Sequence, residues 1–391
     1  MFFFYTYSFN SFNIGYFILL NAIILNLYNN DAKDYIFILL FIFISFSISI
    51  INNLNYIWVL MESQTFTLIL LMVLRNKVTF LFIETLFKFL FISTLVSFQI
   101  LFYLIISSMF YDSNIINFFF FQTILSYFIS IPIIFKMGFA PFYFWLPEIF
   151  LGINFFSILM ISSLPKIILF IILIKINNFN FFIYFIILLS LIISCIMGIN
   201  QSNIKLLIFY SSLFNFSIII SSLLIDNVFY TVSLIYMIIY YIVFFSIMII
   251  LIDYFENKQL IIFFTNFYLK NKLICLIFIS FIFSLIGIPP FSGFWIKFYI
   301  IKNLVINNFF FLSFFIILTS FISSFYYLRM IKVIYNYNIN NFIIWNNLYR
   351  HNNYKKKSLK LIIILLLFFI NYTIFILCPS FLYIYSFQIL L

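Results

Sequence analysis

Long apolar segments dominate the sequence and restrict what the chain can fold into. Nearly uncharged segments of about twenty residues or more follow one another, and about twenty residues match the thickness of a membrane's hydrocarbon core. Hydrophobic residues make up 66% of the 391, and only 7% are charged, too few to cover a water-exposed surface. The predicted fold is an all-α polytopic membrane protein with about twelve transmembrane helices. The expected spans lie near residues 9–28, 35–53, 55–75, 87–110, 115–150, 153–175, 179–199, 204–225, 228–252, 272–303, 308–333 and 359–388.

Two of these spans, 115–150 and 272–303, are too long for one straight helix across a membrane. Each contains a Gly/Pro interruption, GFAP at 138–141 and GIPPFSG at 287–293. Because proline removes a backbone donor and clashes with the preceding turn, both helices are predicted to break near mid-membrane. Two corresponding broken helices, about five spans apart, are typical of an inverted-repeat transporter. We therefore expect a single transmembrane domain, 1–391, with a first repeat at about 35–225, a second at about 228–333 and a C-terminal helix at about 359–388.

The basic residues of the predicted loops fall mainly on one side of the membrane. The opposite side has little more than Lys175 and Lys302. This asymmetry satisfies the positive-inside rule and predicts that both termini face away from the basic side. The net charge of +11 is therefore interpreted as a topology signal rather than a nucleic-acid footprint. The residues assigned to the basic side are Arg75, Lys77, Lys205, Lys258, Lys270, Lys272, Lys332, Arg350, Lys355, Lys356, Lys357 and Lys360.

Ligands for a metal or a redox centre are scarce. Cys195, Cys275 and Cys378 lie singly in apolar stretches, and His351, the one histidine, lies in a polar loop. Haem, iron–sulfur clusters and structural zinc need grouped Cys or His ligands, and a phosphate loop needs clustered glycines. We expect no cofactor in this chain, so any electrons of an associated redox reaction travel in another subunit.

Four charged residues lie inside predicted spans, where topology does not explain them. Glu62 lies within YIWVLMESQTFTLILL, and Lys136 immediately precedes the first break. Lys166 lies halfway through its helix beside Pro165, and Lys297 follows the second break. A charge at a helix centre costs about 2.5–3.5 kcal/mol unless a partner or a water-filled cavity offsets it. As a set they are interpreted as functional, although for each alone snorkelling or a static ion pair stays open.

Two further charges, Glu84 and Lys88 in FIETLFKFLF, are four residues apart and are predicted to face each other on one helix. A structural ion pair and a functional role both remain open for them. Lys205, in NQSNIKLLIFYSS, stands at a helix start on the basic side. It is interpreted as a topology determinant.

Several motifs in this order resemble a known family. KMGFAPFYFWLPE at 136–148 resembles the KxGxAPFHFWxPE signature of mitochondrial NADH dehydrogenase subunit 2, an antiporter-like membrane subunit of respiratory complex I. The order and spacing of the similar motifs hold from about residue 54 to 303. The other motifs that resemble this family are YIWVLMES, IETLFKFLF, SSLPKIILF, NQSNIKLLIFYSS and GIPPFSGFWIKF.

The resemblance implies a proton-translocating membrane-arm subunit of NADH:ubiquinone oxidoreductase. It implies that Glu62 pairs with Lys136, the switching lysine of the first repeat. It further implies that Lys166 connects the half-channels and that Lys297 is the terminal lysine of the second repeat. NADH, FMN, iron–sulfur clusters and ubiquinone are then expected in other subunits.

Departures from the family pattern weaken parts of this mechanism. The histidine of APFHFW is Tyr143 here, so no imidazole relay exists at that position. The His and Gly of the family's YSSIAHMG stretch correspond to Asn215 and Ser217. A link between Lys166 and Lys297 would then need water or hydroxyl groups such as those of Tyr210, Ser211 and Ser212. Bacterial relatives begin with extra spans, which are expected to be lost here or supplied by a separate chain.

The abundance of Phe, Ile, Asn, Lys and Tyr reflects A/T-rich codons and favours an organelle-encoded protein. We expect the mitochondrial inner membrane, with the basic side in the matrix, both termini in the intermembrane space, and other complex I membrane-arm subunits as partners. A sister antiporter-like subunit, a free-standing cation/proton antiporter and a non-conducting scaffold remain alternatives. The continuation EIFLGINFFSILMISSLPK, which is not His-rich, favours subunit 2 over its sisters.

Overall fold

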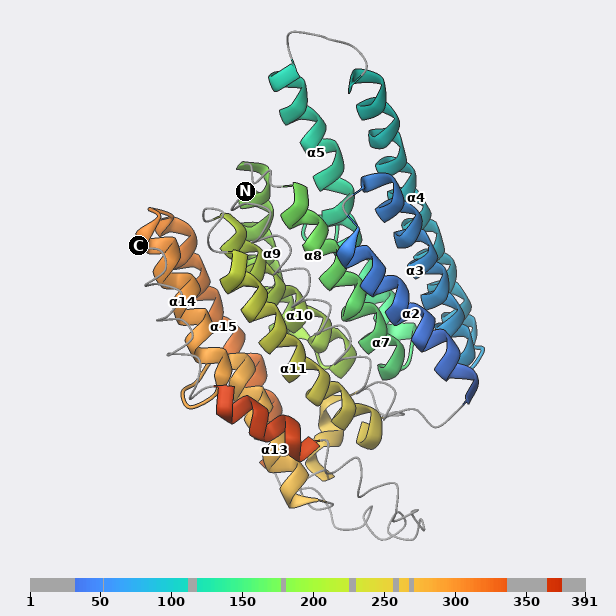
Figure 1. Cartoon of the computed structure of the whole chain (residues 1–391). Helices are drawn as coiled ribbons and strands as arrows, with labels where there is room; N and C mark the ends of the chain where they lie inside the picture. The colour runs from blue at the N-terminus through green and yellow to red at the C-terminus, as the bar shows by residue number, and fades with distance from the viewer. Residues whose placement is uncertain are drawn as a thin grey trace. The chain divides into compact units, whose positions relative to one another are not determined.

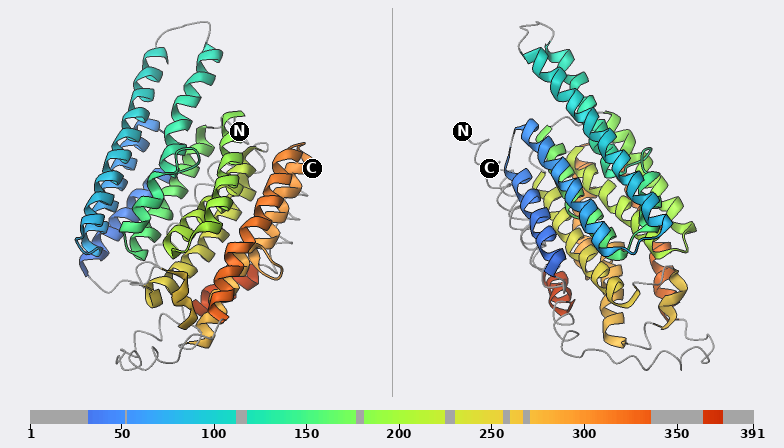
Figure 2. Two further views of the ribbon diagram at one scale, coloured as in Figure 1. Left: turned by 180° about the vertical axis from the view of Figure 1, so that it is seen from behind. Right: turned by 90° about the vertical axis from the view of Figure 1, so that its right-hand side faces the viewer.

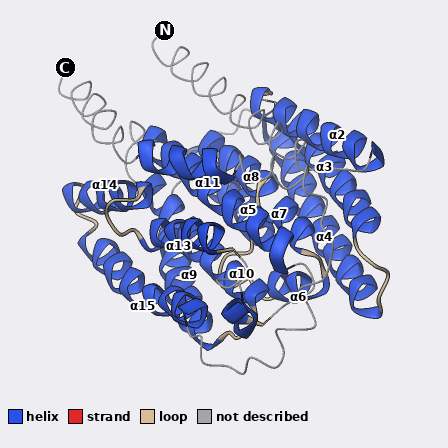
Figure 3. Cartoon of the chain, turned by 90° about the horizontal axis from the view of Figure 1, so that it is seen from below, coloured by secondary structure: helices blue, strands red, loops and turns tan. Residues whose placement is uncertain are grey.

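The computed structural model describes residues 32–51, 53–111, 118–176, 181–224, 230–255, 260–266, 271–335 and 364–374. Within these ranges the regular elements are helices, and the one β contact is an isolated bridge between Asn203 and Leu260 (Figure 3). Seven helical segments in the described part of the chain are long and apolar enough to cross a membrane, and one of them, Phe155–Ile174, runs through both α7 and α8. The predicted all-α polytopic membrane fold is confirmed.

The chain divides into two compact units, Met1–Ser190 and Leu191–Leu391. In the first unit α2 packs along α3, α4 packs along α5, and α8 contacts both α2 and α5 (Figures 1 and 2). Its helices are α2 (Ala32–Ile50), α3 (Leu54–Arg75), α4 (Phe80–Tyr111), α5 (Phe118–Met137), α6 (Trp145–Gly152), α7 (Phe155–Ser162) and α8 (Leu164–Ile176). Helix α9 (Phe181–Asn200) runs across the boundary between the units.

In the second unit α11 packs against α10, α13 and α14, and α15 packs against α13 and α14. A further short helix, Ile364–Ile374, is joined to α14 by a hydrogen bond that the Ser292 hydroxyl donates to Asn371. The helices of this unit are α10 (Ile204–Ser221), η1 (Ser222–Leu224), α11 (Tyr230–Phe255), η3 (Ile261–Asn266), α13 (Lys272–Ile286), α14 (Ser292–Ile306) and α15 (Phe310–Tyr335).

Each predicted span that falls on described residues contains a helix, whereas 9–28 lies outside them. The overlong span 115–150 is divided into α5 and α6, and 272–303 into α13 and α14. The span 153–175 is also interrupted, at Ser163 between α7 and α8. The repeat boundaries expected near 35–225 and 228–333 stay a prediction.

The first break is fixed by a glycine. Helix α5 ends at Met137, and Gly138 follows with φ 76°, a left-handed conformation that costs glycine little. The Gly138 N–H donates to the carbonyl oxygens of Ile134 and Phe135, at 3.1 and 3.0 Å. A Cβ atom at Gly138 would collide with Cδ1 of Leu146, so the glycine also lets α6 approach.

The second break uses two glycines. Helix α13 ends at Ile286, and Gly287 has φ 89° and donates its N–H to the carbonyl oxygen of Phe283 at 3.0 Å. Gly293 lies in the first turn of α14, where a Cβ atom would collide with the carbonyl oxygen of Ser284. The break therefore covers 287–291, which is shorter than the predicted 287–293 because α14 already begins at Ser292.

Candidate functional site

The first unit brings Glu62 and Lys136 together. Glu62 lies on α3 and Lys136 in the last turn of α5, and their Oε1 and Nζ atoms are 4.0 Å apart. Their side chains are 30% and 11% exposed. Within the described ranges neither Glu62 Oε1 nor Lys136 Nζ forms a hydrogen bond with a protein group. The pair is thus an electrostatic contact that has room to tighten or to open.

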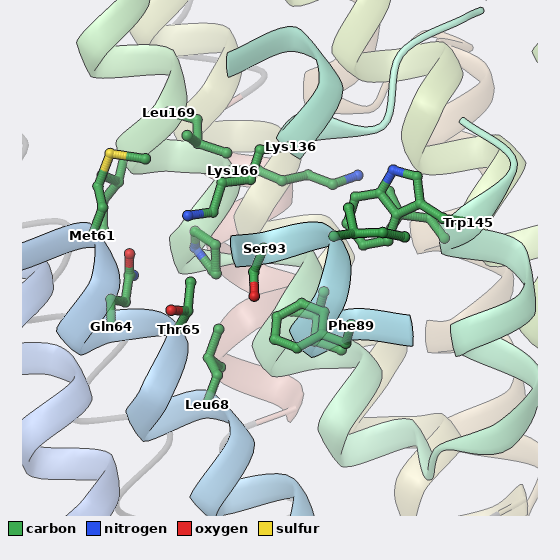
Figure 4. Close-up of a pocket in the computed structure, with 15 residues that line it drawn as sticks. Met61, Gln64, Thr65, Leu68, Phe89, Ser93, Lys136, Trp145, Lys166 and Leu169 are labelled. Atoms are coloured by element: carbon green, nitrogen blue, oxygen red, sulfur yellow. The ribbon is translucent and has the colours of Figure 1, made fainter. Parts of the chain in front are cut away.

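Lys136 shares a cavity with Lys166. The two lysines line a cavity of about 30 Å³, enclosed by side chains from α3 to α8 (Figure 4). The volume is sufficient for water, since a buried water needs about 10–15 Å³ of such space. The other polar or amphipathic side chains in its wall are those of Gln64, Thr65, Ser93 and Trp145.

Three buried donors border this cavity. Gln64 Nε2, Lys136 Nζ and Trp145 Nε1 form no hydrogen bond with any protein group in the described part of the chain. An unsatisfied buried polar group costs about 1–3 kcal/mol, so native proteins meet such groups with water or a ligand. The sequence interpretation missed Gln64 and Trp145. The signal was present, because Gln64 is a polar residue two positions after Glu62 in an apolar helix.

Lys166 is positioned by the interruption of its helix. Ser163 separates α7 from α8, and Pro165 follows in the first turn of α8, where a missing N–H does no harm. Lys166 then projects from the first turn of α8 into the cavity and is only 5% exposed. The sequence placed Lys166 mid-helix, whereas the structure places it beside a helix start.

Asn76 ties the end of α3 to the start of α7. Its Nδ2 donates to Ser157 Oγ at 2.9 Å, and its Oδ1 accepts the N–H of Asn154 at 2.8 Å. Nδ2 also donates to the carbonyl oxygen of Met72 at 2.9 Å. These bonds fix the helix that carries Glu62 against the helix pair that leads to Lys166.

Glu84 and Lys88 form the predicted pair, and a third residue joins them. Lys88 Nζ lies 2.7 Å from Glu84 Oε1 and 2.5 Å from Glu148 Oε2. All three side chains are more than a third exposed. Glu148 lies on α6, so the cluster links α4 to the segment that follows the first break. The sequence interpretation had treated Glu148 only as part of a motif.

Lys297, in the second unit, is held by the broken helix itself. Its ammonium donates to the carbonyl oxygens of Leu285 at 2.5 Å and Ile286 at 3.1 Å. These residues end α13, where helix carbonyls lack intrahelical partners and carry partial negative charge. The ring of Phe214 lies 5.5 Å from Nζ. Among the described residues, therefore, the charge is met by carbonyls and an aromatic face rather than by a carboxylate.

Two of the three hydroxyl groups considered for a relay, those of Ser211 and Ser212, are engaged within α10. Ser211 Oγ donates to the carbonyl oxygen of Ile208 at 2.9 Å, and Ser212 Oγ donates to that of Phe209 at 2.8 Å. Their protons therefore satisfy the helix backbone. Lys205, interpreted as a topology determinant, has a buried side chain at the start of α10.

The sequence is similar to known membrane proteins. Residues 51–323 match the family described as NADH:quinone oxidoreductase/Mrp antiporter, TM. NADH-ubiquinone oxidoreductase chain 2 of Aedes aegypti is 32% identical over 224 residues, covering 56% of this chain and 63% of the relative. NADH-quinone oxidoreductase subunit N of Hydrogenovibrio crunogenus is 28% identical over 220 residues, covering 53% of this chain and 46% of the relative.

Solved structures show the same fold. A chain of respiratory complex I from Thermus thermophilus matches with a TM-score of 0.76 and 17% identity, over 94% of this chain and 85% of that one. A chain of the Mrp complex from Dietzia matches with a TM-score of 0.67 and 14% identity, over 76% and 60%. The family match covers well over half of the sequence, and the chain belongs to the NADH:quinone oxidoreductase/Mrp antiporter transmembrane family.

Proposed function

We propose that this chain is a proton-translocating membrane subunit of an NADH:quinone oxidoreductase. The observation that carries the proposal is the cavity that Lys136 and Lys166 share, with Glu62 4.0 Å from the first of them. The names of the relatives, NADH-ubiquinone oxidoreductase chain 2 and NADH-quinone oxidoreductase subunit N, support it. The matched segments span 63% and 46% of those relatives, so the complex-level activity enters here as a proposal.

The Glu62–Lys136 pair acts as the switch. A buried ammonium is costly unless a negative charge lies near it, and Glu62 supplies that charge at 4.0 Å. When Glu62 moves away or pairs elsewhere, the ammonium loses this stabilisation and releases its proton. Because the two groups form no tight hydrogen bond, a small displacement of α3 against α5 is sufficient to alter the balance.

Water in the cavity receives the proton. Gln64 Nε2 and Trp145 Nε1 are buried donors that need an acceptor, and a water molecule in the cavity meets that need. Lys166 borders the same space from α8, so one or two waters carry a proton between the lysines. In this scheme Lys166 accepts a proton that leaves Lys136 and passes it along the membrane plane.

Lys297 also holds and releases a proton, but its ammonium is stabilised by backbone carbonyls instead of a carboxylate. The carbonyl oxygens of Leu285 and Ile286 stabilise its ammonium without a carboxylate. The amine retains hydrogens for donation after it has released its proton, so the contact with α13 survives the change of charge. Lys297 is accordingly proposed as a holding site whose geometry is fixed.

The chemistry that drives this movement belongs to other chains in the proposal. NADH, FMN, iron–sulfur clusters and ubiquinone are assigned to other subunits of the complex, and this chain is proposed to carry no redox centre. Its proposed neighbours are other membrane-arm subunits of that complex. We place it in the mitochondrial inner membrane with its basic loops in the matrix and both termini in the intermembrane space.

Cation/proton antiport is the second candidate, because the matched family includes Mrp antiporters. Hard cations such as Na⁺ are bound by clustered oxygen ligands. The cavity of the first unit instead contains two lysines and the donor groups of Gln64 and Trp145. Its positive character favours proton transfer over binding of a metal cation.

The test replaces Lys136 in the assembled complex. Lys136→Met keeps the apolar bulk of the stem and removes the ammonium, whereas Lys136→Arg keeps a charge that cannot release its proton. Both variants are expected to assemble on a blue-native gel and to move fewer protons per NADH oxidised. Lys302→Met, a change on α14 outside the proposed path, serves as the control. Normal transport in both Lys136 complexes would overturn the proposal. A reduced amount of complex with normal transport per assembled complex would favour a scaffold.

A further inference from the structure

A second group of buried polar side chains lies within the second unit. Asn215 on α10, Tyr236 on α11, and Tyr326 and Tyr327 on α15 are all buried. Three helices that are distant in sequence thus direct an amide and three phenol groups toward one region. The Lys136 cavity contains none of these residues.

Asn215 orients one of the phenols. Its Nδ2 donates to the carbonyl oxygen of Ser211, one turn earlier on α10, at 2.9 Å. This bond holds the amide in one orientation. The hydroxyl of Tyr236 donates to that Oδ1 at 3.3 Å. The position of the Tyr236 hydroxyl therefore depends on the Asn215 side chain.

The other two phenols are incompletely satisfied. The rings of Tyr326 and Tyr327 lie 4.4 Å apart, and the Tyr327 hydroxyl lies beside the side chains of Ser211 and Asn215. Within the described ranges neither hydroxyl makes a direct hydrogen bond of good geometry. An unsatisfied buried hydroxyl is destabilising, and Phe would fill nearly the same space without that penalty. The presence of these hydroxyls is therefore explained either by hydrogen bonds to water or by a function that requires them.

The cluster is connected to Lys297. The ring of Phe214, the residue before Asn215, lies 5.5 Å from Lys297 Nζ. The Cys195 thiol is close enough to interact electrostatically with Lys297 and also with Tyr326 and Tyr327. The ammonium and two of the phenols therefore share Cys195 as an electrostatic neighbour, and Phe214 places Lys297 beside the α10 residue that precedes Asn215.

We propose that the hydroxyls of Tyr236 and Tyr327, bridged by water and oriented by Asn215, form a proton relay that serves Lys297. The relay rests on the proposed proton-translocating function. A hydroxyl oxygen accepts one proton while its own proton passes to the next oxygen, so the transfer consumes no group and needs no co-reactant. Asn215 is a positioning residue in this scheme, because its amide aligns the Tyr236 hydroxyl and carries no proton itself.

The test removes hydroxyls and leaves the rings in place. Tyr236→Phe and Tyr327→Phe are expected to assemble and to lose proton transport per NADH oxidised. The double variant is expected to lose no more than the more severe single variant, because steps in series are not additive. Asn215→Leu is expected to reproduce the loss of Tyr236→Phe. Tyr241→Phe removes one hydroxyl from another fully buried residue of α11 and is expected to retain normal transport.

A parallel measurement on Lys136→Met separates the relay from the wider proposal. Reduced transport in Lys136→Met with normal transport in both tyrosine variants would overturn the relay alone. Normal transport in all of them would overturn the proton-translocating function and the relay together. A purely structural role would lower the unfolding temperature of the complex with unchanged transport per assembled complex, and this outcome also counts against the relay. If the Tyr327→Phe complex does not assemble, proton transport in the Tyr236→Phe complex alone tests the relay.

Discussion

Lys297 of α14 donates a hydrogen bond to the carbonyl oxygen of Leu285 near the end of α13, 2.5 Å away. A lysine that follows the break thus caps the helix that precedes it. The negative end of α13 offers the ammonium what a carboxylate offers elsewhere. Lys136 is held differently, by the carboxylate of Glu62 at 4.0 Å. The chain therefore stabilises one buried ammonium with fixed backbone carbonyls and another with a side chain that can move.

Because Lys297 is held by backbone carbonyls, we predict that substitutions of Lys297 can change the stability of the complex and its proton transport independently. Lys297→Met leaves two helix-end carbonyls without their donor, which costs about 1–3 kcal/mol and lowers the unfolding temperature of the complex. Lys297→Arg keeps donors for those carbonyls but holds its proton at any accessible pH. We expect Arg to recover stability and not proton transport. Recovery of transport by Arg would contradict a proton-holding role.

Gly293 is predicted to tolerate substitution least among the glycines of the second unit. In Gly293→Ala the new methyl group meets the carbonyl oxygen of Ser284, a backbone atom that cannot rotate away. Overpacking of this kind costs about 1–3 kcal/mol or more. Gly198→Ala is the control, because its nearest contact is a side-chain atom of the Tyr326 ring at 3.1 Å rather than a backbone atom. We expect a lower unfolding temperature and less assembled complex for Gly293→Ala, and equal values for the two variants would disprove this.

The sequence predicted the features that depend on composition and backbone chemistry. Pro and Gly marked both helix breaks because their backbone effects are local, and Glu62 and Lys136 stood out because charge in an apolar span is costly. The contacts of Lys297 with α13 and of Glu148 with Lys88 were not predicted. Both depend on the direction in which a helix resumes after its break, and local sequence does not encode that direction.

The tyrosine cluster was missed for a related reason. With 28 tyrosines and 65 phenylalanines in the chain, a single buried Tyr carries little signal. Only tertiary packing of α10, α11 and α15 shows that Tyr236 and Tyr327 converge on Asn215. A serine within a helix commonly donates its hydroxyl proton to the carbonyl of the preceding turn. Ser211 and Ser212 do so, and the prediction of a relay through them had not taken this preference into account.

Asn76→Leu is predicted to loosen the Lys166 helix pair from α3. The substitution removes the bonds to Ser157 and Asn154 and leaves the Asn154 N–H without its acceptor, at a cost of about 1–3 kcal/mol. Hydrogen exchange at the start of α7 should then increase. Asn55→Leu, at an exposed position in the first turn of α3, is the control and should leave this exchange unchanged. Unaltered exchange in Asn76→Leu would show that packing alone holds α7.

Removal of Lys88 is predicted to be more harmful than removal of Glu148. Glu148→Gln leaves Lys88 paired with Glu84 at 2.7 Å, whereas Lys88→Met leaves two carboxylates close together without a cation. Assembly on a blue-native gel measures the effect. If adding Glu148→Gln to Lys88→Met restores the amount of assembled complex that Lys88→Met alone reduces, the cluster is a structural ion pair. If assembly is normal in both and proton transport falls in either, the cluster takes part in translocation.

Removing a polar group from the wall of the first unit's cavity tests most directly whether water in that cavity carries protons. Gln64→Leu replaces a buried amide with an apolar side chain of similar size and leaves Glu62 and Lys136 in place. The variant cavity has one polar group fewer to bind water, so we expect less proton transport per NADH oxidised and weaker water density between Lys136 and Lys166 in a cryo-EM map of the complex. Gln99→Leu, an exposed position on α4, should leave both measurements unchanged. Full transport by Gln64→Leu with no water in its cavity would show that the proton moves between the lysines by another route.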